Sequence, residues 1–262
     1  MYKYKIFNNI AEDGIEILKN NKFTNEENNA QALLLRSQVL TNNDFNESLL
    51  CVGRAGAGTN NIPIDEATKR GVVVFNTPGA NANAVKELVL CGLLLASRGI
   101  IQGNAFSKTL DGKDANTVNK AMEDQKKLFK GNELKGKTLG VVGLGAIGSM
   151  VAQAAQNMGM NLVGYDPHIS IDSAWRLPKE VKKADSLEDL LRTSDYISLH
   201  VPLIEATKNL INISKLKHCK KGAKLINLSR GGIVNNEDII SALDAGIVDR
   251  FITDFPTPEL IK

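Results

Sequence analysis

Apolar and polar positions divide the chain into two successive series of strand and helix segments. In the first series, short apolar runs predict strands at residues 4–8, 32–35, 49–53 and 72–75. Residues 13–19 and 65–70, between these strands, have helical spacing. Continuous apolar strands separated by helices are typical of parallel β-α-β units, because helices cover both faces of such a sheet. We expect a small α/β domain here.

The second series begins at residue 138 and predicts a larger sheet. Its expected strands are residues 138–142, 161–165, 196–201, 224–228 and 251–254, and its expected helices are residues 146–158, 187–192, 213–218 and 236–245. This order of elements is typical of a doubly wound parallel sheet, in which a ligand lies beyond the carboxyl ends of the strands.

The segment between the two series sets the expected domain boundary. Residues 84–98 are apolar nearly all round, and a helix of that kind must be buried on several sides, between domains or between subunits. Residues 102–135 are polar and contain glycines, which is typical of a connection. We therefore expect one domain at residues 1–97 and a second at 98–262. Residues 20–29, rich in Asn and Lys, are expected to form a solvated face or a loop.

Three glycines directly after the strand at 138–142 form a G-x-G-x-x-G sequence: Gly143, Gly145 and Gly148. In a dinucleotide site the first glycine allows a tight turn, the second lets the backbone approach a pyrophosphate, and the third lets helix and strand pack closely. The amino end of the following helix offers N–H groups and a positive dipole to the anion. A plain tight β-α turn is the alternative.

Asp166 follows the next strand, where its carboxylate can accept hydrogen bonds from both ribose hydroxyls of the adenosine. The same carboxylate repels a 2′-phosphate, and Pro167 and His168 follow it rather than Arg or Lys. We therefore expect NAD rather than NADP as the cofactor. A carboxylate that only caps a turn is the alternative. The fold class is then α/β, with a Rossmann doubly wound parallel sheet and a smaller flavodoxin-like α/β substrate domain.

Composition and charge remove several other classes of function. The net charge of +3 comes from 32 basic and 29 acidic residues scattered along the chain, so no strong field attracts nucleic acid or a membrane. Residues 88–96, the longest nearly uninterrupted apolar stretch, are too few to cross a bilayer, and the N-terminus has no apolar signal core. We expect a cytoplasmic protein without nucleic-acid or membrane partners. The three cysteines and three histidines show no metal-ligand spacing, so no metal is expected.

Two arginines next to glycines are candidates for binding an anion. Arg230 lies just beyond a predicted buried strand, where a guanidinium can hold a carboxylate through two hydrogen bonds and polarise an adjacent carbonyl. Arg54 lies in a loop whose N–H groups at Gly53, Gly56 and Gly58 can form an anion-binding concavity. The alternatives are a surface ion pair for Arg230 and a tight turn with a solvated side chain for Arg54.

These motifs, in this order and spacing, resemble the D-isomer-specific 2-hydroxyacid dehydrogenases. The resemblance rests on residues 143–148, Asp166, the His-Val-Pro-Leu sequence at 200–203, the Asn-Leu-Ser-Arg-Gly-Gly-Ile-Val sequence at 227–234 and the Thr-Asp-Phe-Pro sequence at 253–256. Residues 53–62 and 76–81 are similar to the substrate loop and hinge of the 3-phosphoglycerate dehydrogenases within that family. Nearly the whole chain is covered.

The resemblance implies a role for each matching residue. Arg230 would bind the substrate carboxylate and carbonyl oxygen, and Glu259 would support a catalytic histidine. The substrate contacts would be Arg54, Gly56 and Ala57, with Arg36 as a weaker candidate for the substrate phosphate. The cofactor contacts would be Thr77, Gly143, Gly145, Ala146, Ile147, Gly148, Asp166, Val201, Leu228, Ser229, Arg230 and Asp254.

The family's catalytic histidine lies in a Pro-His-x-Gly segment some tens of residues beyond the glutamate. The chain stops at Lys262, so we expect that the C-terminal part of both domains is missing from it and that this fragment is inactive by itself. His200, at the carboxyl end of a predicted strand, is a weak substitute because it belongs to a different motif.

The resemblance further implies NAD-dependent oxidation of 3-phospho-D-glycerate to 3-phosphohydroxypyruvate, a step of serine synthesis, by a homodimer or higher homo-oligomer. Another small 2-hydroxy acid, such as glycerate, glyoxylate or lactate, remains an alternative substrate. A non-catalytic NAD(H)-binding regulator is the second alternative.

Overall fold

The computed structural model describes residues 2–261, and its chain divides into two compact units, Met1–Asn81 and Ala82–Lys262. The boundary therefore falls at residue 81, earlier than the expected boundary at residue 97. Helix α3 (Ala82–Ser97) accounts for the difference, because it packs against helix α6 (Ala146–Asn157) of the second unit. Val89 and Leu93 of α3 share one hydrophobic core with Leu139 and Val151.

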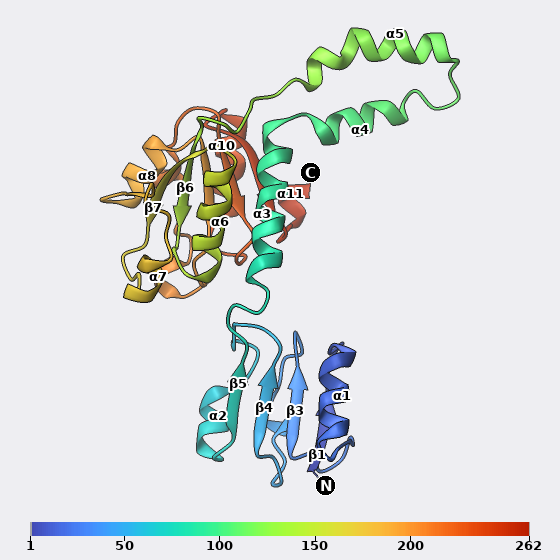
Figure 1. Ribbon diagram of the computed structural model, residues 1–262, viewed down its shortest axis with the longest axis vertical. Coiled ribbons are helices and arrows are strands. Elements are labelled where there is room, and N and C mark those ends of the chain that lie inside the picture. The colour runs from blue at the N-terminus through green and yellow to red at the C-terminus, as the bar shows by residue number, and fades with distance from the viewer. Residues whose placement is uncertain (1, 262) are drawn as a thin grey trace. The chain divides into compact units, whose positions relative to one another are not determined.

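The first unit contains a five-stranded parallel sheet in the order β2-β1-β3-β4-β5 (Figure 1). Its strands are β1 (Tyr2–Ile6), β2 (Phe23–Asn25), β3 (Ala32–Leu35), β4 (Cys51–Arg54) and β5 (Val73–Asn76), and its helices are α1 (Glu12–Asn20), η1 (Asn42–Asp44) and α2 (Ile64–Lys69). The order 2-1-3-4-5 is that of flavodoxin-like folds, as the sequence predicted.

Strand β2 lies within residues 20–29, which were expected to form a loop or a solvated face, so that expectation was wrong for residues 23–25. Phe23 is its one apolar side chain, so the segment lacks the pattern of a buried strand. Backbone pairing with β1 forms the strand instead, with Tyr2 opposite Phe23 and their ring centroids 5.6 Å apart.

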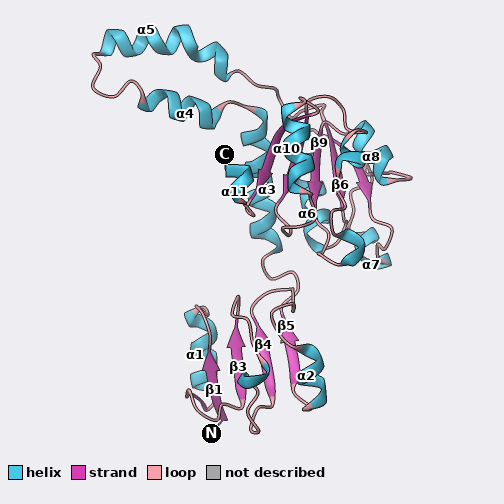
Figure 2. Ribbon diagram, turned by 180° about the vertical axis from the view of Figure 1, so that it is seen from behind, coloured by secondary structure: helices cyan, strands magenta, loops and turns pink. Residues whose placement is uncertain are grey.

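The second unit contains a six-stranded parallel sheet in the order β11-β10-β9-β6-β7-β8 (Figure 2). Its strands are β6 (Thr138–Val142), β7 (Asn161–Tyr165), β8 (Lys182–Lys183), β9 (Tyr196–Leu199), β10 (Ala223–Asn227) and β11 (Val248–Thr253). Read from β8, this is the order 3-2-1-4-5-6 of a Rossmann fold. Because the chain reverses direction across the sheet between β6 and β9, their carboxyl ends form the topological switch point.

Helices cover this second sheet and bury its apolar side chains. The remaining helices of the sheet region are α7 (Ile171–Trp175), α8 (Leu187–Thr193), η3 (Glu205–Thr207), α9 (Ile213–Leu216), α10 (Asn236–Asp244) and α11 (Pro258–Ile261). Leu139 and Val141 of β6 contact the core beneath α3 and α6, whereas Val142 contacts the core that contains Leu190 of α8. Elements β8, α7 and α11 were not expected, since each is too short to show a periodic pattern.

Residues 102–135 form helices rather than the polar connection expected. Helix α4 (Ile100–Lys108) and helix α5 (Ala115–Gln125) run side by side and, with η2 (Lys126–Phe129), extend from the sheet of the second unit as an arm (Figures 1 and 2). The Asp114 carboxylate caps α5 by accepting hydrogen bonds from the N–H groups of Asn116 and Thr117. Neither α4 nor α5 buries a residue, so the sequence here lacks the apolar residues that mark a helix packed on a core.

One face of β9 carries hydroxyl and imidazole groups into the core beneath α3. The Tyr196 hydroxyl lies 2.8 Å from the Ser97 hydroxyl, and the Ser198 hydroxyl lies 2.9 Å from Nε2 of His200. Nδ1 of His200 is buried and has no hydrogen-bond partner among residues 2–261, although the residue as a whole is partly exposed. Burial lowers the pKa of His200 from 6.5 to about 4, so its ring is neutral at physiological pH.

Replacing Leu93 by Ala should destabilise the second unit. Leu93 is fully buried between α3 and the sheet, so the substitution leaves a cavity and should cost roughly 2 to 5 kcal/mol of unfolding free energy. Urea unfolding followed by circular dichroism measures the loss. Ile171→Ala, at an exposed position of α7 in the same unit, should change the midpoint little; equal effects of the two substitutions would contradict the assignment of α3 to this core.

His200 should make the second unit less stable as the pH falls from about 6.5 to about 4. In this window the unfolded chain takes up a proton at His200 while the folded chain does not, which favours unfolding by about 3 kcal/mol in total. His200→Gln should remove that part of the acid dependence in urea unfolding measured across this range. His218→Gln, at an exposed histidine, should leave it in place; an unchanged slope in the His200 variant would contradict the neutral buried ring.

Candidate functional site

The glycine loop at the switch point joins β6 to α6 within three residues. Gly143 has φ of 88°, and a Cβ there would lie 2.6 Å from the backbone oxygen of His200. A Cβ at Gly148 would lie 2.0 Å from the backbone oxygen of Gly143. Backbone atoms thus leave no room for a side chain at either position. Glycine at both positions lets the helix pack closely against the sheet.

Gly145 differs from the other two glycines because the space beside it is open. A Cβ built there would meet no described atom within 4 Å. Gly145 is the N-cap of α6, so the N–H groups of Ala146, Ile147 and Gly148 form the first turn, where helix N–H groups have no partner within the helix. The loop therefore leaves room for an anionic group at the positive end of a twelve-residue helix.

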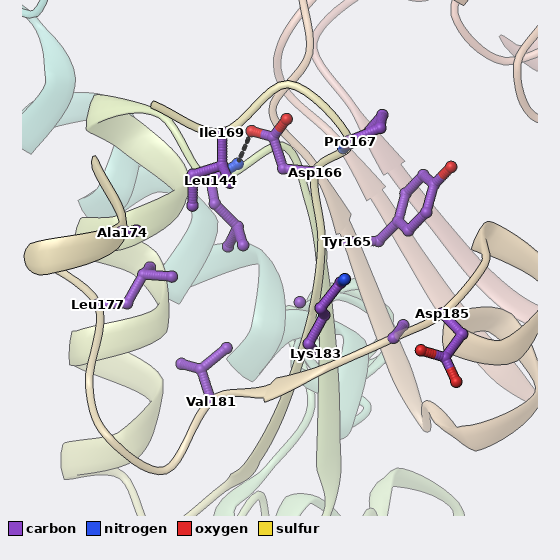
Figure 3. Close-up of a pocket in the computed structure, with 12 residues that line it drawn as sticks. Leu144, Tyr165, Asp166, Pro167, Ile169, Ala174, Leu177, Val181, Lys183 and Asp185 are labelled. Carbon is purple, nitrogen blue, oxygen red and sulfur yellow. Dashed lines mark hydrogen bonds between the residues drawn. The ribbon is translucent and has the colours of Figure 1, made fainter. Parts of the chain in front are cut away.

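Asp166 follows β7 directly and is fixed by two backbone hydrogen bonds. One carboxylate oxygen accepts the N–H of Leu144 at 2.8 Å, as Figure 3 shows, and the other accepts the N–H of His168 at 2.9 Å. Each carboxylate oxygen has a second lone pair, so Asp166 can still accept hydrogen bonds from a ligand. The glycine loop and the acidic side chain are thereby tied together.

An apolar cavity of about 360 Å³ adjoins Asp166 on the side of α7. Figure 3 shows the side chains of Leu144, Ile169, Leu177 and Val181 around it, with Asp166 at its rim. The space beside the carboxylate is therefore not filled by protein. Together with the open space at Gly145 and the first turn of α6, this cavity makes the residues present compatible with a dinucleotide.

The parallel strands bring the other candidates of the second unit to the same edge of the sheet. Val201 follows β9, Leu228 and Ser229 follow β10, and Asp254 follows β11. Leu228 is buried, whereas Asp254 is exposed. These residues, far apart in the sequence, therefore share the edge on which the glycine loop lies.

Asn227 shapes the loop that carries Arg230, and sequence reasoning did not single it out. Its side chain is buried, its Nδ2 donates to the Arg230 backbone oxygen at 2.9 Å, and its Oδ1 accepts the Ser229 hydroxyl at 2.8 Å. The available signal was a polar residue at the end of an otherwise apolar strand.

Arg230 itself is exposed at the carboxyl end of the sheet. Its Nη1 donates to the backbone oxygen of Ser229 at 2.7 Å, which leaves the other guanidinium N–H groups to bind an anion. Glu259 lies in α11 and is exposed; hydrogen bonds from its own backbone N–H and from the Thr257 hydroxyl lower the pKa of its carboxyl. The Glu259 carboxyl is therefore ionised at neutral pH.

The first unit brings together the candidates expected to bind substrate and one expected to contact the cofactor. Thr77 accepts the N–H of Gly56 with its hydroxyl at 2.7 Å, and its own N–H donates to the Gly56 oxygen at 3.0 Å. Asn76 donates from Nδ2 to the oxygen of Ala57 at 2.7 Å. The loop after β4 is thus fastened to the segment after β5, with Arg54 partly buried and Arg36 exposed.

Residues 2–261 lack three further features: a histidine open to a ligand at position 200, a metal-binding group and a membrane-spanning helix. His200 presents neither ring nitrogen for proton exchange with a ligand, because Nδ1 is buried and Nε2 is bonded to Ser198. No group of three or more His, Cys, Asp or Glu side chains is arranged to hold a metal ion. None of the helices in this range is long and apolar enough to cross a membrane.

Two family models match the chain. The model described as D-isomer specific 2-hydroxyacid dehydrogenase, NAD binding domain, matches residues 94–262, and the model of the catalytic domain of the same family matches residues 6–172. Each covers more than half of the chain.

Curated relatives and solved structures agree with these matches. D-3-phosphoglycerate dehydrogenase of Methanocaldococcus jannaschii is 35% identical over 94% of this chain and 47% of its own length. The enzyme of the same name from Bacillus subtilis is 38% identical over 91% of this chain and 44% of its own length. The chain therefore spans about half the length of the curated relatives it matches.

The crystal structure of cofactor (NAD+)-bound 3-phosphoglycerate dehydrogenase from Entamoeba histolytica matches this chain with a TM-score of 0.74 and 26% sequence identity. The match covers 98% of this chain and 81% of the Entamoeba chain. The NAD-binding model, the strand order and the glycine loop converge on one conclusion. This chain belongs to the D-isomer-specific 2-hydroxyacid dehydrogenases, and its second unit contains the NAD-binding domain of that family.

Proposed function

We propose that this chain is part of an enzyme that oxidises 3-phospho-D-glycerate to 3-phosphohydroxypyruvate with NAD. The observation that carries the proposal is the placement of Arg230 at the same sheet edge as the glycine loop and Asp166. Relatives at 35 to 38% identity that are named D-3-phosphoglycerate dehydrogenase support the choice of acid.

Within this proposal, the second unit binds the dinucleotide through groups whose geometry fits it. The N–H groups of the first turn of α6 bind the pyrophosphate beside Gly145, and Asp166 accepts hydrogen bonds from the ribose. The further contacts come from Thr77, Gly143, Val201, Leu228, Ser229 and Asp254. NAD, when bound, supplies the acceptor for the hydride that leaves C2 of the substrate.

Arg230 binds and orients the substrate in this scheme. Its guanidinium holds the carboxylate through paired hydrogen bonds and places the C2 oxygen within its field. The proton of the C2 hydroxyl would pass to the histidine that the family resemblance places beyond the glutamate, and Glu259, ionised at neutral pH, would stabilise the protonated form of that histidine. Arg36, Arg54 and the N–H of Ala57 bind the remaining anionic group of the substrate, the phosphate. Gly56, whose N–H is bonded to Thr77, holds the loop beside it.

The preference for a phosphorylated acid follows from the two arginines of the first unit. A substrate with a single carboxylate needs one guanidinium, which Arg230 supplies. Arg36 and Arg54 add two further positive charges in the first unit. Glycerate, glyoxylate and lactate carry no second anionic group that these arginines could bind.

We also propose that the protein is a homodimer that buries the arm and part of α3. Ile100, Ile101 and Leu128 of the arm are 50%, 60% and 73% exposed, and Leu88 and Leu94 of α3 are 48% and 44% exposed. Exposed apolar side chains on the arm and on α3 favour association, because an interface removes them from water.

The complete natural protein should reduce 3-phosphohydroxypyruvate with NADH at a kcat/KM at least about tenfold above that for glyoxylate, hydroxypyruvate or pyruvate, and NADPH should serve poorly. Arg230→Lys should lower kcat/KM by roughly a hundredfold, because a lysine cannot make the paired hydrogen bonds. Steady-state assays measure both. NADH binding without turnover of any of these acids would contradict the proposal and favour an NAD(H)-binding regulator.

Placing aspartates on the arm should dissociate the dimer. The double substitution Ile101→Asp and Leu128→Asp puts charges on the proposed interface, where their desolvation opposes association. Sedimentation velocity should show a monomer at concentrations where the unchanged protein is a dimer. Ile171→Asp, equally exposed but on α7 outside the arm, is the control and should remain dimeric; a dimeric arm variant would place the interface elsewhere.

A further inference from the structure

Asn61 is a buried side chain whose hydrogen bonds join two loops of the first unit. It is 8% exposed and lies in the loop between β4 and α2. Its Oδ1 accepts the Nε–H of Arg54 at 3.1 Å. Its Nδ2 donates to the backbone oxygens of Arg36 at 3.3 Å and Gln38 at 2.6 Å. One amide therefore contacts both arginines assigned above to the substrate.

The segment that carries Arg36 is held from its other side by Asn8. Oδ1 of Asn8 accepts the backbone N–H groups of Arg36, Ser37 and Gln38 at 3.4, 3.0 and 2.7 Å. Asn8 reaches them from a left-handed conformation, with φ of 65°. The N–H groups of residues 36–38 thus bind Asn8, and the carbonyl oxygens of Arg36 and Gln38 bind Asn61. These bonds fix the backbone of the segment, whereas the side chain of Arg36 is exposed.

The guanidinium of Arg54 is fixed at two places. Its Nε–H is directed at Asn61, and its Nη1 lies over Gly56, where a Cβ would come within 2.4 Å of it. The plane of the group is set by these contacts, because a guanidinium is rigid and planar. Rotation of Arg54 away from this position would break the bond to a buried acceptor, which is unfavourable.

We propose that Asn61 is a positioning residue for substrate binding, which holds Arg36 and Arg54 in a fixed relation so that they form a preformed anion site. This inference rests on the proposed function, and it goes beyond it by assigning the role to a residue that is buried away from the ligand. Preorganisation raises affinity because the Arg54 guanidinium and the backbone that carries Arg36 need not be ordered when the anion binds.

Asn46 offers a matched control in the same unit. It is half-buried and, like Asn61, joins two segments: its Nδ2 donates to the Ala30 oxygen at 3.1 Å and its Oδ1 accepts the Ser48 N–H at 2.8 Å. It bonds to neither arginine. Asn46→Ala therefore removes hydrogen bonds of the same kind without touching the proposed anion site.

In the complete natural protein, Asn61→Ala should raise the KM for 3-phosphohydroxypyruvate about tenfold or more. The substitution removes both the charge-assisted hydrogen bond to Arg54 and the two hydrogen bonds that hold the backbone of residues 36–38. The kcat should change less than threefold and the NADH dissociation constant should not change. Asn46→Ala should leave all three constants alone, apart from any loss of thermal stability. An equal KM in the two alanine variants would overturn the inference.

A double-mutant cycle with Arg54→Ala separates positioning from general destabilisation. If Asn61 acts through Arg54, the KM of the double variant should exceed that of Arg54→Ala by no more than about twofold to threefold, so the two effects are not additive. Fully additive effects would contradict the proposed role. Should Asn61→Ala fail to fold, Asn61→Asp keeps the shape but loses both donors to residues 36 and 38, and its KM should still rise.

Binding of inorganic phosphate, measured by calorimetry in the absence of NADH, distinguishes failure of this inference from failure of the proposed function. Phosphate binding that is weakened by Asn61→Ala, in a protein without dehydrogenase turnover, would support the anion site and contradict the proposed reaction. Turnover with phosphate binding that is identical in the unchanged protein and in Asn61→Ala would leave the reaction standing and overturn the role of Asn61.

Discussion

The close packing of α6 against β6 is the constraint on which the rest of the second unit depends. Gly148 and the carbonyl of Gly143 approach so closely that a single Cβ would overlap the oxygen. This approach lets the amino end of α6 open directly at the switch point between β6 and β9. The hydrogen bond from Leu144 to Asp166 then connects the loop to the end of β7. An anion site and a ribose acceptor thus result from one backbone contact.

The two units use different means to place charged side chains. In the second unit, parallel strands carry Arg230 and Asp254 to one sheet edge, and the buried Asn227 shapes the loop after β10. In the first unit, the side chains of Asn8 and Asn61 replace regular secondary structure as partners for the backbone of residues 36–38. Short polar side chains can form such local bonds where a loop must hold a fixed shape.

Much of the fold could be predicted from the chain because its central strands are short apolar runs between turn residues. The ranges of β3, β6 and β7 agree with expectation, since each is a continuous apolar run bounded by turn residues. Strand β2 and the arm helices could not be predicted in this way: Phe23 gains its place from pairing with β1, and α4 and α5 lack a core to impose a periodic pattern. Asn61 was missed because nothing local distinguishes it from Asn60.

The sequence by itself determined the class of fold, the glycine loop and the identity of the charged residues, because each depends on residue type and spacing along the chain. Only the tertiary structure decided that α3 belongs to the second unit, that Thr77 is bonded to Gly56, and that Nδ1 of His200 is buried without a partner among the described residues. These facts depend on contacts between segments distant in sequence, and the free energy of such contacts comes from burial and geometry that no single segment contains.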